Sequence, residues 1–162
     1  MNDKVDISLK DVSETLLIPL YCRARETESD NPIIKDPKAV EMIKALDYTM
    51  LNVRRSKLKG LIITLSIRSK IFDECVSSFL EQSPNAVVVN LGCGLDTRFL
   101  RLDNGTVEWY DLDLPDAITV RRHFFQETDR NHFISASVFD AEWIDTVAQK
   151  AIVLSCLLLR GS

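Results

Sequence analysis

Cysteine and histidine are scarce in this chain of 162 residues, and their scarcity excludes two classes of site. The four cysteines are far apart and include no CxxC pair, and only two histidines are present, so we predict neither a zinc site nor a disulfide framework. Unpaired thiols are typical of a reducing compartment. We therefore expect a cytoplasmic protein that binds no metal.

Basic charge and long apolar runs are also lacking. The net charge is −4 at pH 7, and Arg121 and Arg122 are expected on a solvated helix face, so we predict no nucleic-acid partner. The longest apolar run, residues 151–159, is much shorter than the ~20 residues that span a bilayer, and the amino terminus lacks the apolar core of a signal peptide. We expect no membrane segment and a soluble protein of about one domain.

The first third of the chain contains no glycine, so it is helix-permissive except where its prolines, Pro19 among them, divide it. A short helix is expected after Ser13, and a second from Pro37, where proline takes the first helical position. Residues 67–80 give the clearest helix, because one continuous apolar face runs along them. Its members are Ile67, Ile71, Phe72, Cys75, Val76, Phe79 and Leu80. We assign residues 1–82 to a helical cap and lead-in helix.

Strands and helices alternate after residue 83. Residues 87–89 form an apolar run typical of a parallel strand buried on both faces, and residues 107–110 and 132–136 form two further strands. A helix is expected to run from Pro115 to Phe125. This alternation implies a parallel sheet.

A glycine turn follows the first expected strand. Gly92 and Gly94 would let the backbone approach a ligand closely at the carboxyl end of that strand. Asp113 lies 21 residues after Gly92, close to the spacing of about 20 expected for a carboxylate that binds a ribose diol, and Asp111 is the alternative. Thr97 stands where a dinucleotide fingerprint has its third glycine, which favours S-adenosylmethionine over NAD. A tight turn without a ligand is the simpler alternative.

The same segments resemble a known family. Residues 90–98 read NLGCGLDTR and residues 111–115 read DLDLP, which are hallmarks of the leucine carboxyl methyltransferase-like family, and within it of bacterial O-methyltransferases related to the tetracenomycin polyketide enzyme. The likeness covers about residues 13–149. It implies an α/β, Rossmann-like fold of the S-adenosylmethionine-dependent methyltransferases, here the amino-terminal half with a helical cap, in which residues 83–149 bind S-adenosyl-L-methionine.

The resemblance also implies roles for individual residues. Arg68 would pair with the carboxylate of the cofactor's methionine moiety, for which its planar, permanently charged guanidinium is suited, although a surface ion pair with Asp73 or Glu74 is the alternative. Ser137 and Val138 match the positions that contact adenine. The predicted cofactor-binding residues are Arg68, Gly92, Cys93, Gly94, Asp111, Asp113, Ser137 and Val138.

Several of these positions keep a structural alternative. Asp113 could accept hydrogen bonds from both ribose hydroxyls, or could cap the helix that Pro115 begins. Cys93 is expected to fill space within the turn. Asp96 and Arg98 either pair around the loop or contact the ligand. Phe139 is expected to pack in the core or to lie beside the adenine.

Methyl transfer from a sulfonium requires mainly that the acceptor is held in line and that water is excluded. No Ser-His-Asp set, carboxylate pair or metal cluster indicates other chemistry. We therefore predict an O-methyltransferase that acts on a hydroxyl or carboxyl group of an unidentified small molecule, with no catalytic residue assigned. The alternatives are a non-catalytic fragment that binds cofactor weakly or associates with a protein, and an NAD-binding module.

Residues 150–162 are expected to form an atypical tail, because they do not match the family pattern and the family's second half does not follow. The expectation is a chain truncated after about residue 149 and without turnover of its own. An incomplete sheet would expose an apolar edge through which the chain could self-associate.

Overall fold

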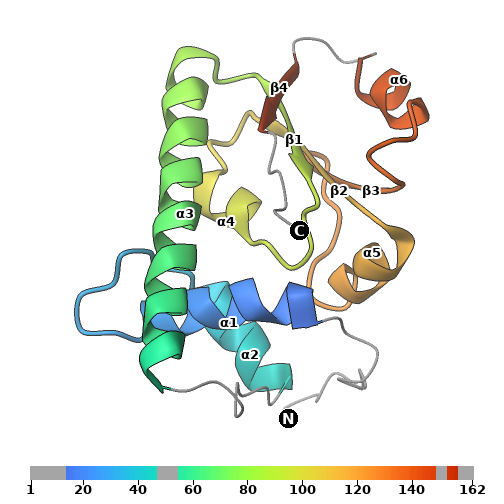
Figure 1. The fold of residues 1–162 in the computed structure, drawn as a ribbon. Helices are drawn as coiled ribbons and strands as arrows, with labels where there is room; N and C mark the ends of the chain where they lie inside the picture. Colours follow the sequence, from blue (N-terminus) through green and yellow to red (C-terminus); the bar gives the residue numbers. More distant parts are fainter. Residues whose placement is uncertain (1–13, 47–54, 149–152, 157–162) are drawn as a thin grey trace. The chain divides into compact units, whose positions relative to one another are not determined.

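The computed structural model describes residues 14–46, 55–148 and 153–156, which form parts of two compact units, Met1–Asp73 and Glu74–Ser162 (Figure 1). In the described part of the chain, no helix is long and apolar enough to cross a membrane.

Helix α1, Glu14–Thr27, begins the described part of the first unit. It continues through Pro19, so the prediction that this proline divides the segment was wrong. Proline removes one intrahelical hydrogen bond. Burial of the leucines on both sides of it, Leu17 and Leu20, offsets that loss.

Helix α2, Pro37–Leu46, begins at the predicted proline. Asp36 caps it, because its Oδ1 accepts a hydrogen bond from the Ala39 amide at 3.0 Å. The other carboxylate oxygen of Asp36 pairs with Nε of Arg23 at 2.8 Å, and both side chains are buried. One carboxylate thus ends the loop between α1 and α2 and neutralises a buried arginine.

Helix α3, Arg55–Gln82, is much longer than predicted and spans the boundary of the two units. Its predicted apolar face is only partly buried. Val76 and Leu80 are buried, whereas Ile67 is 43% exposed and Ile71 53% exposed. The two isoleucines project about 100° or more from the buried stripe, which a window of apolar residues at helical spacing does not reveal.

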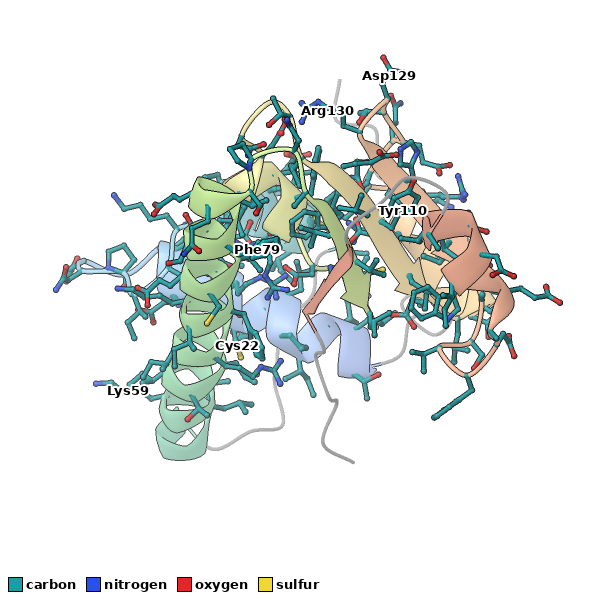
Figure 2. The ribbon with its side chains drawn as sticks, turned by 90° about the horizontal axis from the view of Figure 1, so that it is seen from above. Cys22, Lys59, Phe79, Tyr110, Asp129 and Arg130 are labelled. Carbon is teal, nitrogen blue, oxygen red and sulfur yellow. The ribbon has the colours of Figure 1, made fainter. Side chains whose placement is uncertain are left out.

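The second unit contains a parallel sheet with the strand order β3-β2-β1-β4. The strands are β1 Val87–Leu91, β2 Glu108–Asp113, β3 Asn131–Ser135 and β4 Val153–Cys156. The first three confirm the predicted strands, with β2 extended to include both acidic residues. β4 lies in the apolar run to which the sequence pattern assigns no element. Figure 2 shows the strands side by side, with Tyr110 on β2.

Three short helices complete the described elements of this unit: α4 Arg98–Leu102, α5 Pro115–Arg121 and α6 Glu142–Ala148. α5 begins at Pro115 as predicted but ends at Arg121, before the expected Phe125.

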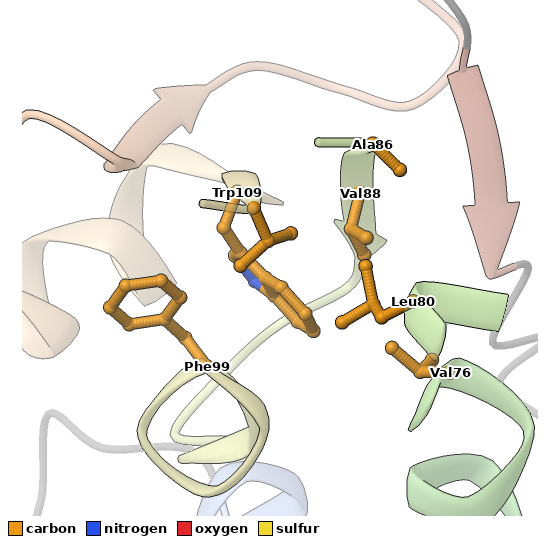
Figure 3. Packing of buried hydrophobic residues seen from close by; sticks show 7 residues of the cluster. Val76, Leu80, Ala86, Val88, Phe99 and Trp109 are labelled. Carbon is orange, nitrogen blue, oxygen red and sulfur yellow. The ribbon is translucent and has the colours of Figure 1, made fainter. Parts of the chain in front are cut away.

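Apolar clusters cover both faces of the sheet. On one face, Trp109 packs with Val88 between Phe99 of α4 and Leu80 of α3 (Figure 3). On the other face, Val147 of α6 packs with alternate residues of β1 and β2. Burial on both faces explains why every residue of β1 except Asn90 is apolar.

Candidate functional site

The candidate site lies where β1 and β2 end side by side. The two strands are parallel, and Asn90 pairs with Asp111 in register and Leu91 with Leu112. The glycine turn after β1 therefore meets the acidic end of β2. This is the sheet edge at which open α/β sheets bind ligands.

The turn requires its glycines for backbone conformation. Gly92 has a φ of 63° and Gly94 a φ of 47°, values that residues with a Cβ rarely adopt. Apart from Gly92 itself and its two chain neighbours, nothing lies within 4 Å of where a Cβ of Gly92 would stand, so conformation and not space is the constraint there. The Cys93 amide donates to the carbonyl of Leu112 at 3.1 Å, which attaches the turn to β2.

Asp113 lies between the turn and α5. Its Oδ2 accepts from the Gly94 amide and its Oδ1 from the Leu114 amide, each at 2.8 Å. A carboxylate has about four acceptor positions, so two remain for a ligand. The N-cap of α5 is Leu114, which makes no side-chain cap bond, so the capping alternative for Asp113 was wrong.

Asp111 has a different environment, although it is only two residues away. It is 1% exposed, and its Oδ1 accepts from Asn90 at 2.8 Å and from the indole of Trp109 at 3.0 Å. Its Oδ2 pairs with Nη2 of Arg121 at 2.6 Å. This geometry favours Asp113, which is 7% exposed, as the residue that meets a ligand.

The prediction of a solvated face was wrong for Arg121, which is 1% exposed, and correct for Arg122, which is half-exposed and pairs with Glu127. Burial acts to lower the pKa of Arg121, but the charge of Asp111, with the further contributions of Cys93, Asp96 and the hydrogen bond to Asp111, outweighs it, and the pKa is raised above its ordinary value. The sequence contains a signal for this burial. Arg121 follows Ala117 by four positions, which places it on the buried face of α5.

Asp96 and Arg98 form the structural pair that was one of their two predicted roles. Nη1 of Arg98 lies 3.1 Å from Oδ2 of Asp96, and the arginine is buried. Arg101 approaches the same carboxylate at 3.4 Å.

Cys93 is buried inside the turn, and burial raises the pKa of its thiol well above the ordinary value, with Arg121 opposing the shift in part. The thiol is therefore neutral and unreactive near neutral pH, as expected of a residue that fills space. In the described part of the chain, no group of three histidine, cysteine or acidic side chains could hold a metal ion.

Ser137 and Val138 follow β3, at the same edge of the sheet. Ser135 pairs in register with Asp113, and the Ala136 amide donates to the carbonyl of Asp113 at 3.1 Å. Val138 is partly exposed. The next residue, Phe139, is 94% exposed, so the expectation that its side chain packs in the core was wrong.

Arg68, by contrast, belongs to the first unit. It is exposed on α3, and its contact with a cofactor stays a prediction.

A parallel α/β sheet with a glycine turn after its first strand and a carboxylate at the end of its second defines a nucleoside-binding class of fold. The chain belongs to the leucine carboxyl methyltransferase family, whose model matches residues 17–153.

Two relatives show the extent of the likeness. The tetracenomycin polyketide synthesis O-methyltransferase TcmP of Streptomyces glaucescens is 39% identical over 142 residues, which cover 87% of this chain and 52% of TcmP. The S-adenosyl-L-methionine-dependent methyltransferase dpfgK of Gibberella zeae is 32% identical over 134 residues, which cover 77% of this chain and 45% of dpfgK. The chain thus spans about half the length of these relatives.

Proposed function

We propose that this chain is the cofactor-binding part of an S-adenosylmethionine-dependent O-methyltransferase whose acceptor is a hydroxyl or carboxyl group of a small molecule. One observation carries the proposal: Asp113 holds the glycine turn through the Gly94 amide and keeps two acceptor positions unused. Two ribose hydroxyls would occupy them. The names of the two relatives support the reaction type.

The other predicted residues keep the roles that the family resemblance implies. Gly92, Cys93 and Gly94 would present main-chain atoms to the ligand, and the partly exposed Val138 with Ser137 would contact adenine. Arg68 would bind the methionine carboxylate.

Bound S-adenosylmethionine would supply an electrophilic methyl group. The residues of this chain would hold the nucleoside and keep water from it, which is most of what such a transfer requires of a protein. Asp113 would orient the ribose, and its own amide contacts would keep the turn in place.

Two finer points are part of the proposal. The described cysteines, Cys22, Cys75 and Cys93, are free thiols, which supports a cytoplasmic location. This chain covers about half of each relative's length, and methyl transfer by the whole protein is part of the proposal.

Isothermal titration calorimetry with S-adenosylhomocysteine and NAD tests the proposal. A two-glycine turn with one acidic strand end suits a single nucleoside, so we expect S-adenosylhomocysteine to bind at least about tenfold more tightly, a difference of about 1.4 kcal/mol. Equal or stronger binding of NAD would favour the dinucleotide alternative. Binding of neither ligand would contradict a cofactor site.

A further inference from the structure

The guanidinium of Arg121 bonds to the glycine turn as well as to Asp111. Its Nη1 donates to the carbonyl of Gly94 at 2.9 Å and to the carbonyl of Asp96 at 2.8 Å, while Nη2 donates to Asp111. One buried side chain of α5 thus joins the end of β2 to two peptide groups of the turn after β1. The sequence separation is 27 residues to Gly94 and 25 to Asp96.

Aromatic rings restrict this guanidinium further. Its central carbon lies 4.2 Å from the ring centroid of Phe125 and 5.1 Å from that of Phe133. These contacts and the three hydrogen bonds leave the group little freedom of orientation. The carbonyl oxygens of Gly94 and Asp96 therefore accept hydrogen bonds from a guanidinium that is itself held in place.

A gain in the free energy of folding does not explain this arrangement well. A buried ion pair often contributes no more to folding than apolar side chains of the same volume. Nε of Arg121 is also buried without a hydrogen-bond partner among the described residues, which adds a desolvation cost. What the bonds from Arg121 to Gly94 and Asp96 specifically determine is the position of the turn.

We propose that Arg121 is a positioning residue that fixes the conformation of residues 92–98. The proposed function assigns this turn to cofactor binding. The expected effect of Arg121 on cofactor affinity therefore rests on the proposed function, whereas its effect on the conformation of the turn does not. With the carbonyls of Gly94 and Asp96 held inward, the backbone at Gly92 stays in the conformation that leaves its outer side open to a ligand.

Hydrogen exchange of residues 92–98 and affinity for S-adenosylhomocysteine test this in three variants. Arg121→Lys keeps the charge opposite Asp111 but cannot reproduce the fork that reaches both carbonyls. Phe125→Leu removes the nearer ring without leaving a charge unpaired. Trp109→Phe is the control, because it removes another donor of the same carboxylate without touching the turn.

We expect Arg121→Lys and Phe125→Leu to accelerate exchange locally at residues 92–98. Arg121→Lys should also weaken S-adenosylhomocysteine binding by about tenfold, a typical effect of losing a hydrogen bond to a charged group. Trp109→Phe should lower the melting temperature without either change.

Exchange that rises equally along the whole chain in all three variants would overturn the proposal, because it would assign Arg121 to overall stability alone. The readouts also separate the two proposals. If the wild-type chain bound no S-adenosylhomocysteine, the proposed function would fail, and local exchange at residues 92–98 would still decide whether Arg121 fixes the turn. If Arg121→Lys did not fold, Phe125→Leu would decide it.

Discussion

At the scale of residues, the candidate site depends on the difference between two aspartates on the same face of β2. The Asp111 carboxylate accepts hydrogen bonds from the side chains of Asn90, Trp109 and Arg121. The Asp113 carboxylate accepts from two backbone amides and keeps acceptor positions for a ligand. The spacing from Gly92 predicted that one of the two aspartates would bind the ribose. It could not decide between them, because the decision depends on an arginine that comes later in the chain.

Substitution of each aspartate should therefore affect a different property. Asp113→Ala should weaken S-adenosylhomocysteine binding by about 1.5–3 kcal/mol per lost contact, before compensation by water. Asp111→Ala should instead lower the free energy of unfolding by about 3–5 kcal/mol, because it leaves a buried arginine unpaired. Calorimetry and urea unfolding measure the two effects, and Asp116→Ala, at an exposed acid of α5, is the control. Unchanged affinity in Asp113→Ala with a large loss in Asp111→Ala would assign the ribose to Asp111.

Thiol reactivity gives a second prediction at this scale. Cys75 is exposed, whereas Cys22 and Cys93 are buried. Burial raises the pKa of Cys22 from 9.0 to about 11, so its neutral form contributes stability that is complete below pH 9 and is lost as the pH rises through about 11. Brief alkylation at pH 8 followed by mass mapping should modify Cys75 and spare Cys22 and Cys93. Rapid modification of Cys93 in the folded protein would contradict the packing of the turn.

At the scale of elements, local chemistry predicted the strands and the helix starts well. Proline at the first helical position located α2 and α5, and apolar runs located β1 to β3. The failures have tertiary causes. Helix α1 continues through Pro19 because its neighbours are buried, and the exposed side of α3 carries isoleucines that periodicity assigns to the core. Similarly, the burial of Arg23 depends on Asp36, which lies 13 residues later in the chain.

The junction of α1 and α2 provides a prediction about element stability. Asp36→Ala removes both the cap of α2 and the buried ion pair with Arg23, so the free energy of unfolding should fall by about 3–5 kcal/mol. Glu41→Ala is a matched control, because it breaks the exposed pair with Lys38 and should change stability by less than about 1 kcal/mol. Urea unfolding of both variants measures the difference. Similar small losses would show that the buried pair is not coupled to folding.

At the scale of the whole molecule, the chain has the fold and the family hallmarks of a methyltransferase over about half the length of its relatives. The hallmarks at residues 90–98 and 111–115 predicted the family correctly. The partner of Arg121 and the exposure of Phe139 could not be predicted, since both depend on segments that meet only in the folded sheet.

Self-association is a proposal at this scale. β3 and β4 are the outer strands of the described sheet, and an outer strand offers backbone groups to a further strand. Light scattering over a dilution series should show an average mass that rises with concentration. A constant monomer mass over the whole range would contradict pairing through a sheet edge.

A crystal structure of the chain with S-adenosylhomocysteine tests the central claim most directly. The claim is that the glycine turn and the end of β2 bind one nucleoside. We predict both ribose hydroxyls within about 3 Å of the Asp113 carboxylate, a normal hydrogen-bond distance, and an intact pair between Asp111 and Arg121. A ribose bound to Asp111, or a ligand away from the turn at Gly92 and Gly94, would contradict it.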